Sequence, residues 1–237
     1  MSVAAVDKSQ QRIRQMFGAI APYYDLLNHL LSLNIDRRWR ARTVRRVPPQ
    51  GSAPILDLCT GTGDLALAYA AAAGGQAPVI AADFCAPMLD RATHKRRADQ
   101  TLTWVQADAQ RLPFPSDLFQ VVSVAFGLRN VADTDRGLAE MVRVLRPGGR
   151  LAILEFSRPT QPILSQLYLG YFRYVLPFIG QTISRNRDGA YRYLQESVLQ
   201  FPDGAAMAQK LRDHGLIDVR FEPLTFGIAS LYIGVKP

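Results

Sequence analysis

The stretch ILDLCTGTGDLA, residues 55–66, constrains the fold of this chain more than any other. Apolar residues around one acid indicate a buried strand, a glycine-rich turn follows, and the Ala and Leu residues after it favour a helix. Gly61 and Gly63 can take positive φ, which lets a ligand approach the backbone closely. The helix that begins near Asp64 points its free N–H groups at this turn. A strand, turn and helix in this order indicate a nucleotide-type cofactor site.

Two cofactor classes fit this stretch, and a turn without any ligand is a third interpretation. The Gly-x-Gly-x-x-Ala pattern matches the loose dinucleotide fingerprint, and Asp83 lies near the ~20-residue offset of the acid that binds a ribose. The segment also resembles the first motif of the class I S-adenosylmethionine-dependent methyltransferases, in which an acid precedes a glycine-rich run. Asp57 takes the place of that acid. Cys59 replaces the first glycine of the usual pattern.

The bulk composition favours one cytoplasmic α/β domain with additions. The chain has 237 residues, of which 48% are hydrophobic, enough for a sizeable core. No run of ~18 apolar residues predicts a membrane-spanning helix, and the N-terminus lacks the shape of a signal peptide. Cys59 and Cys85 are expected to be small packing residues in a reducing compartment rather than nucleophiles or disulfide partners. The three histidines are isolated, so no metal site is expected.

The net charge of +8 is concentrated near the N-terminus. Residues 1–50 carry nine Lys/Arg and three Asp, a net of +6, whereas the rest carries nineteen Lys/Arg and seventeen Asp/Glu, a net of +2. A basic run at 36–42 surrounds Trp39, and a basic helix with an interfacial aromatic residue can lie on a membrane. Each basic residue near an anionic leaflet adds on the order of 1 kcal/mol. Anionic lipid, nucleic acid and a merely solvated helix face all remain open.

The order of expected elements predicts a class I methyltransferase fold of the α/β class, Rossmann-like and mostly parallel. Residues 1–50 are expected to form an N-terminal helical cap, and residues 51–237 a domain with inserted helices at about 160–214. Asp133 can cap a helix that reaches residue 145. A turn is expected at 147–149. The seven expected strands lie at 55–58, 78–83, 102–106, 119–124, 150–156, 217–221 and 228–235, the last ones closing the sheet in antiparallel fashion.

In such a sheet, a ligand lies outside the carboxyl ends of the strands. Asp83 can accept hydrogen bonds from both ribose hydroxyls. Asp108 can accept one from an adenine amino group, and its alternative role is that of an acid that caps a loop or a helix. An aromatic stripe at 164–175 predicts a helix that covers the site and accepts an apolar substrate, or one that packs on the sheet. The residues expected at this rim are Gly61, Thr62, Asp83, Asp108, Phe126 and Glu155.

Later motifs resemble the bacterial menaquinone and ubiquinone biosynthesis C-methyltransferases over nearly the whole chain. The resemblance implies the transfer of a methyl group from S-adenosylmethionine to a ring carbon of a reduced, prenylated quinone. It implies cofactor contacts at Thr62, Asp83, Asp108 and Ala109, beside the motif residues Asp57, Gly61 and Gly63. Ala125 stands where that family often has serine. The matching pieces are YDLLNHLLSLNIDRRWR (24–40), ILDLCTGTGD (55–64), PFPSDLFQ (113–120), FGLRNV (126–131), RVLRPGGRLAILEFSRP (143–159) and YRYLQESV (191–198).

A ring carbon becomes an adequate nucleophile when a neighbouring hydroxyl loses its proton, so the site needs a base or a positive donor beside that oxygen. Arg129 and Asn130 are the candidates, with Arg129 as a stabiliser of the oxyanion or an orienter of a water. Its alternative role is a surface ion pair. Tyr24 and Asp25 are expected to contact the ring hydroxyls, or to pack, whereas His29 is expected to be structural.

Several functional alternatives stay open at this point. Demethylmenaquinol and a methoxy-polyprenyl benzoquinol are both candidate substrates, and an anionic membrane surface is a candidate partner for an enzyme that works at the inner face of the membrane. A methyltransferase for another small molecule or for RNA shares the same cofactor core. An inactive cofactor-binding subunit and an NAD-linked oxidoreductase are the remaining classes.

Overall fold

The computed structural model describes residues 8–21, 32, 34–95, 101–159, 170, 193 and 196–237. The predicted roles of Tyr24, Asp25 and His29 lie outside these residues, as does nearly all of the aromatic stripe at 164–175.

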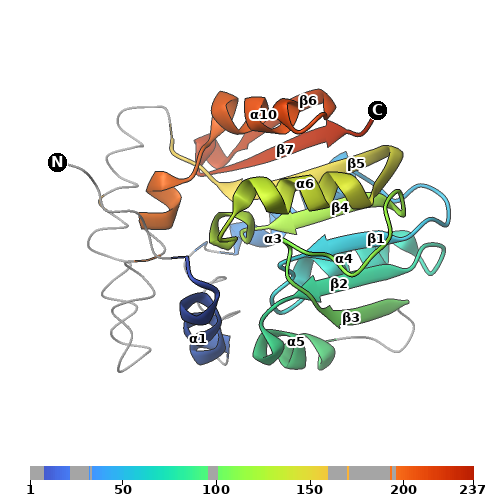
Figure 1. Cartoon of the computed structure of the whole chain (residues 1–237), viewed down its shortest axis with the longest axis horizontal. Helices are drawn as coiled ribbons and strands as arrows, with labels where there is room; N and C mark the ends of the chain where they lie inside the picture. Colours follow the sequence, from blue (N-terminus) through green and yellow to red (C-terminus); the bar gives the residue numbers. More distant parts are fainter. Residues whose placement is uncertain are drawn as a thin grey trace.

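Seven strands form one sheet in the order β3-β2-β1-β4-β5-β7-β6 (Figure 1). Strands β1 to β5 pair in parallel, and β7 runs antiparallel to both β5 and β6. The predicted fold class is therefore confirmed. The strand bounds are β1 Ile55–Leu58, β2 Val79–Asp83, β3 Leu102–Gln106, β4 Phe119–Ala125, β5 Leu145–Phe156, β6 Ile217–Leu224 and β7 Ala229–Val235.

Helices cover both faces of the sheet, because successive side chains of a buried strand point to opposite faces. Ile55 belongs to the core under α3 and α4, and its neighbour Leu56 to the core under α6 and α10. Figure 1 shows α6 in front of the sheet and α3 behind it. The helix bounds are α1 Gln10–Ile20, α3 Ile35–Arg46, α4 Asp64–Ala73, α5 Ala86–Thr93, α6 Thr134–Val144 and α10 Gly204–Asp213.

Helix α6 begins where the sequence predicts, since the Asp133 side chain accepts a hydrogen bond from the backbone N–H of Arg136. The turn predicted at 147–149 is wrong. Strand β5 already begins at Leu145, and the N–H of Gly148 donates to the carbonyl of Lys236. The glycines interrupt the regular pairing of β5 with β4, and Gly148 has a positive φ. The carbonyl of Gly149 accepts the N–H of Lys236, so hydrogen bonds to the chain beyond β7 hold this irregular part of the strand.

The tryptophan in the basic run is a core residue and not the interfacial aromatic that the sequence predicts. Trp39 is 5% exposed, and its indole N–H donates to Thr225 Oγ1 at 2.8 Å. It packs with α4 and the sheet, so α3 is fixed to the core of the protein. The boundary at residue 50 between a cap and the catalytic domain stays a prediction. Within the described part of the chain, no helix is both long and apolar enough to cross a membrane.

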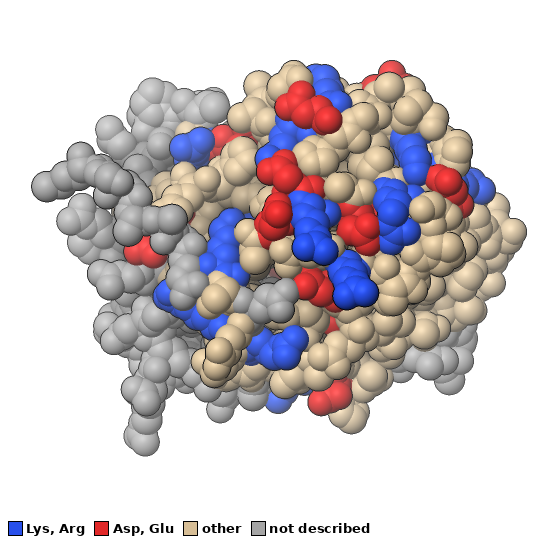
Figure 2. Space-filling view, in the orientation of Figure 1, with Lys and Arg blue, Asp and Glu red and all other residues tan. Residues whose placement is uncertain are grey.

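The charges are unevenly distributed over the surface. Over α6, acidic and basic side chains lie interspersed (Figure 2). Two of the ion pairs on that helix are Arg143 with Glu140 and Lys210 with Asp135. Helix α3, in the layer behind the sheet, carries six arginines and a single acid. Among the described helices, α3 therefore carries a marked excess of positive charge.

Candidate functional site

The turn after β1 is built from residues with positive φ. Gly61 has φ 58° and Gly63 has φ 85°, as the sequence predicts for a backbone that approaches a ligand. Cys59 also takes a positive φ, 49°, at the position where the methyltransferase motif usually has glycine. An added Cβ at Gly127 would lie 2.3 Å from the Cβ of Cys59. The absence of a side chain at Gly127 therefore makes room for the cysteine.

Asp83 lies at the end of β2 and holds the turn in place. Its Oδ2 accepts the N–H of Gly61 at 2.8 Å, and its Oδ1 accepts the N–H of Cys85 at 2.9 Å. Burial raises the pKa of this carboxyl, although these backbone donors oppose the rise. Each oxygen keeps a further lone pair, so the carboxylate can also accept from two vicinal hydroxyls.

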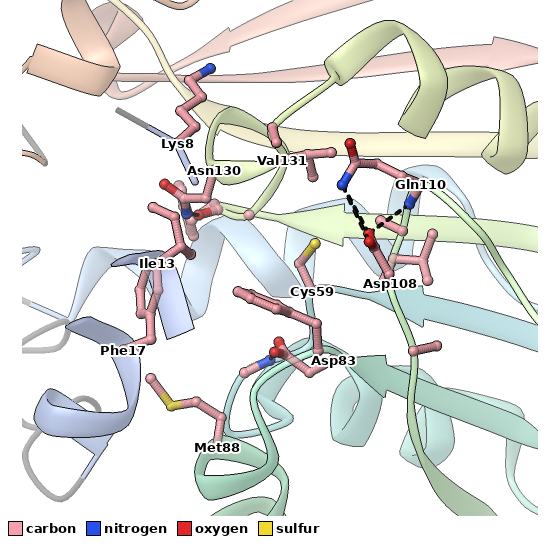
Figure 3. A pocket seen from close by; sticks show the side chains of 18 residues that line it. Lys8, Ile13, Phe17, Cys59, Asp83, Met88, Asp108, Gln110, Asn130 and Val131 are labelled. Atoms are coloured by element: carbon pink, nitrogen blue, oxygen red, sulfur yellow. Dashed lines mark hydrogen bonds between the residues drawn. The ribbon is translucent and has the colours of Figure 1, made fainter. Parts of the chain in front are cut away.

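A pocket opens at the carboxyl ends of the strands, with about 720 Å³ of empty space including the part open to solvent (Figure 3). It brings together several residues that the sequence predicts, namely Gly61, Asp83, Asp108, Ala109, Phe126 and Asn130. The sequence did not point to another group, namely Lys8, Ile13, Phe17, Met88, Gln110 and Val131. Ile13 and Phe17 are spaced as i and i+4 on α1, and this spacing was the one sign in the sequence that they share a helix face. Polar groups line one part of the pocket, and apolar side chains the rest.

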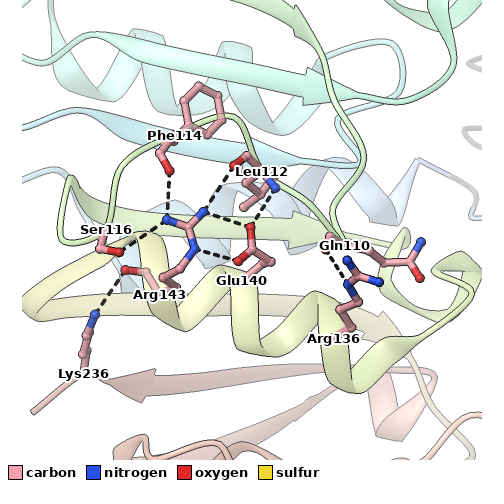
Figure 4. Close-up of polar contacts among 8 residues, drawn as sticks. All are labelled: Gln110, Leu112, Phe114, Ser116, Arg136, Glu140, Arg143 and Lys236. Atoms are coloured by element: carbon pink, nitrogen blue, oxygen red, sulfur yellow. Dashed lines mark hydrogen bonds and ion pairs between the residues drawn. The ribbon is translucent and has the colours of Figure 1, made fainter.

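The loop that carries Asp108 is tied to α6. Asp108 Oδ1 accepts the backbone N–H of Gln110 at 2.9 Å. Further along, Arg143 donates to the carbonyls of Phe114 at 2.9 Å and Leu112 at 3.2 Å, and it pairs with Glu140 at 2.6 Å (Figure 4). Glu140 in turn accepts the N–H of Leu112 at 2.7 Å. Helix α6, which buries one face against the sheet, therefore fixes the backbone on this side of the pocket.

A smaller polar pocket lies on the other side of the glycine-rich turn, lined by Arg40, Asp57, Thr60, Thr62 and Asp64 among others. The predicted cofactor residues divide between these two spaces, and Cys59 lines both. Gly63 is the exception, since it is not among the described residues that line either space. Asp57 is buried and accepts hydrogen bonds from the hydroxyls of Ser123 and Thr60, each at 2.6 Å. Burial raises the pKa of Asp57 to about 6, against these hydrogen bonds and the charge of Arg40.

Arg129 forms an ion pair, but that pair is buried and not at the surface. Its Nη1 lies 2.6 Å from Glu155 Oε1, and its guanidinium carbon lies 5.3 Å from the centre of the Phe156 ring. Its Nε is buried and finds no acceptor among the described residues. Arg129 is not among the described residues that line the larger pocket, whereas its neighbour Asn130 is. Asn130 Oδ1 accepts the hydroxyl of Tyr193 at 3.0 Å, a contact that the sequence did not predict.

Burial and the surrounding carboxylates raise the pKa of the Cys59 thiol well above its ordinary value. The thiol therefore stays protonated, which suits a packing residue better than a nucleophile. Lys8 also lines the pocket, on the side of Asn130 (Figure 3), and burial lowers the pKa of its ammonium group. Among its described residues, the pocket thus combines acids, apolar walls and the basic side chain of Lys8, which suits a ligand with a polar end and an apolar end.

Comparison with known proteins identifies the family of this chain. The profile of the family described as "ubiE/COQ5 methyltransferase family" matches residues 5–236. A Thermus thermophilus protein named demethylmenaquinone methyltransferase is 48% identical over 223 residues, which cover 94% of this chain and 100% of that protein. A Geobacter protein named ubiquinone/menaquinone biosynthesis C-methyltransferase UbiE is 43% identical over 235 residues, 98% of this chain and 99% of that protein. The resemblance inferred from the motifs is confirmed.

Solved structures support the fold at lower identity. A SAM-dependent methyltransferase from Thermotoga maritima has a TM-score of 0.69 at 15% identity, and the match covers 95% of this chain and 100% of that one. A phosphoethanolamine N-methyltransferase from Haemonchus contortus, solved in complex with S-adenosyl-L-methionine, has a TM-score of 0.60 at 17% identity and covers 84% of this chain and 52% of that one.

Proposed function

Because the chain belongs to the ubiE/COQ5 methyltransferase family, we propose that it transfers a methyl group from S-adenosylmethionine to a ring carbon of demethylmenaquinol. The product is menaquinol, a respiratory quinol. The observation that carries this proposal is the 48% identity to a demethylmenaquinone methyltransferase over that protein's full length. The 43% identity to a protein named for both ubiquinone and menaquinone biosynthesis favours a second substrate, 2-methoxy-6-polyprenyl-1,4-benzoquinol.

The donors present fit S-adenosylmethionine. Asp83 offers two oxygens to the ribose hydroxyls, and Asp108 offers an acceptor to the adenine amino group beside the apolar Ala109. Asp57 and Thr62 lie on the other side of the turn, where a carboxylate suits the positively charged end of the cofactor. Gly61 lines the larger pocket with a positive φ and no Cβ, so its backbone leaves room for the cofactor. An added Cβ at Gly63 would instead lie 2.4 Å from the Trp104 ring, so that glycine makes room for the tryptophan. When bound, S-adenosylmethionine supplies an electrophilic methyl group on a sulfonium sulfur.

The protein's part in the chemistry is orientation and charge. A ring carbon attacks once the adjacent hydroxyl gives up its proton, so the phenolate oxygen must be stabilised. In this proposal Arg129, whose buried Nε has no acceptor among the described residues, supplies positive charge, and Asn130 orients the ring from the pocket wall. Tyr24 contacts a ring hydroxyl, a role that stays a prediction because that residue lies outside the described part.

The substrate tail also sets where such an enzyme works. A polyprenyl chain stays in the bilayer, so the protein has to meet its substrate at the membrane surface. In this proposal the basic α3 side makes peripheral contact with the anionic leaflet facing the cytoplasm. Binding to vesicles should therefore rise with the fraction of anionic lipid and weaken as salt is added.

The reaction is tested with methyl-labelled S-adenosylmethionine, the purified full chain and the two reduced demethylated quinols. We expect label in menaquinol, and label in the benzoquinol product as well if the enzyme serves both pathways. Label in neither product, with the cofactor still bound, would overturn the quinol assignment.

The role of Arg129 needs a variant that keeps the buried charge, because removing the guanidinium leaves Glu155 uncompensated in the core. Arg129→Lys keeps that charge but loses the fork of donors. We expect turnover to fall at least about tenfold while the Kd for S-adenosylmethionine stays the same, corresponding to at least about 1.4 kcal/mol of lost transition-state stabilisation. Unchanged turnover would mean that Arg129 only supports the fold.

A further inference from the structure

The turn between β6 and β7 holds an aromatic ring in solvent. Phe226 is 72% exposed, the most exposed large apolar side chain in the described part of the protein. The three residues of this turn, Thr225–Gly227, all have positive φ, at 47°, 58° and 90°. Two of them carry side chains that disfavour this conformation, and such strained backbone persists only where surrounding contacts enforce it.

Contacts from several elements fix the turn. The indole N–H of Trp39 donates to Thr225 Oγ1 at 2.8 Å. On the other side, the hydroxyl of Ser157 donates to the carbonyl of Gly227 at 2.8 Å. Within the turn, the N–H of Ile228 donates a hydrogen bond to the carbonyl of Thr225 at 3.2 Å. With the Thr225 side chain and the Gly227 carbonyl both held, the turn presents the Phe226 ring outward.

The same turn lies at the rim that bears the larger pocket. Ala229, just after the turn, pairs with Phe156 at the carboxyl end of β5. The Phe156 ring lies 4.5 Å from the ring of Phe126, which lines the pocket, and the ring of Trp39 lies 5.9 Å from that of Phe126. A continuous aromatic cluster therefore connects the pocket wall to the turn that carries Phe226.

An arginine stripe runs along α3 on the side next to β6. Arg38, Arg42 and Arg45 are spaced as i, i+4 and i+7, so they share one face of the helix. Arg42 pairs with Glu222 of β6, which places this face beside the strand that leads into the turn. Arg38 and Arg45 are exposed, and no carboxylate among the described residues pairs with them. The surroundings of the turn on this side are therefore positively charged.

We propose that Phe226 and this arginine stripe form a membrane-docking surface for anionic lipid. The Phe226 ring enters the interfacial region of the bilayer, and Arg38 and Arg45 meet lipid phosphates. An exposed aromatic ring beside charges of one sign matches the chemistry of such an interface. This inference rests on the proposed function, because a prenylated quinol has to reach the pocket from a bilayer. Docking here sets the aromatic cluster that borders the pocket next to the lipid.

The test uses the full chain, vesicles of phosphatidylcholine with and without phosphatidylglycerol, and a matched pair of variants. Phe226→Asn removes the ring and installs a residue that tolerates positive φ, so the fold is retained. Ile217→Asn makes the same kind of change at the opposite end of β6, where Ile217 is 48% exposed. We expect Phe226→Asn to weaken binding to vesicles with phosphatidylglycerol at least about fivefold, or about 1 kcal/mol, and Ile217→Asn to leave it unchanged.

A second substrate separates docking from catalysis. With a short-tailed, water-soluble demethylated quinol, Phe226→Asn should turn over as the unmodified chain does. Equal vesicle binding by the two variants would overturn the proposal that Phe226 docks on the membrane. A change in oligomeric state caused by Phe226→Asn would also overturn it, because Phe226 would then belong to a protein interface. Absence of turnover of the short-tailed quinol by the unmodified chain would overturn the proposed function alone, since the vesicle comparison needs no substrate.

Discussion

At the scale of single residues, Asp57 gives the site a pH dependence within the physiological range. Burial raises its pKa to about 6, so the carboxylate forms only as the pH rises through that value. About one-tenth of the group is ionised at pH 5 and about nine-tenths at pH 7. If the carboxylate faces the cationic end of S-adenosylmethionine, the affinity should rise about tenfold over this interval.

Calorimetric titration of S-adenosylmethionine at several pH values checks this prediction. Asp57→Asn is the control, since its amide does not titrate and its affinity should change little between pH 5 and 7. Parallel pH profiles for the two proteins would assign the dependence to another group.

At the scale of elements, α6 supports the cofactor side of the pocket through Arg143. That guanidinium holds the carbonyls of Leu112 and Phe114 in the loop that follows Asp108. Arg143→Met removes these charge-assisted hydrogen bonds, so the loop should loosen and the Kd for S-adenosylmethionine should rise about five- to tenfold, or about 1–1.4 kcal/mol. Turnover at saturating cofactor should change little.

The matched control for this prediction is Arg212→Met on α10, whose guanidinium donates to the carbonyl of Val219, away from the pocket. Binding of S-adenosylmethionine by equilibrium titration distinguishes the two. A cofactor affinity that is the same in both variants would show that α6 supports the fold without positioning the loop.

At the scale of the whole molecule, the cofactor class can be read from folding stability. A ligand that binds only the folded chain raises the free energy of unfolding by about 2.7 kcal/mol at 100 times its Kd. We expect S-adenosylmethionine to raise the melting temperature and NAD to leave it unchanged. Asp83→Asn should reduce the shift, because the uncharged amide is a poorer acceptor for the ribose hydroxyls. A shift with NAD alone would restore the dinucleotide interpretation of the glycine-rich turn.

The sequence by itself determined the elements whose signals are local. Alternation of apolar residues, the glycine-rich turn after residue 58 and the cap at Asp133 are set by neighbours in the chain, so the order of the strands along the sequence and the bounds of α6 were predictable. The acids at strand ends were predictable as rim residues for the same reason. Local patterns failed at residues 147–149, where pairing with the distant Lys236 turned an expected turn into part of β5.

Only the tertiary structure decided what each side chain faces. Trp39 looked like a surface anchor within a basic run, but it is buried in the core and bonded to Thr225. Phe226 is exposed to solvent, because Trp39 and Ser157 hold the residues on either side of it. The alternative role expected for Arg129 was an ion pair at the surface, but its partner Glu155, 26 positions away, makes that pair a buried one. These outcomes depend on contacts between residues far apart in sequence. Whether a side chain such as Trp39 or Arg129 is buried is therefore decided only when those distant segments pack together.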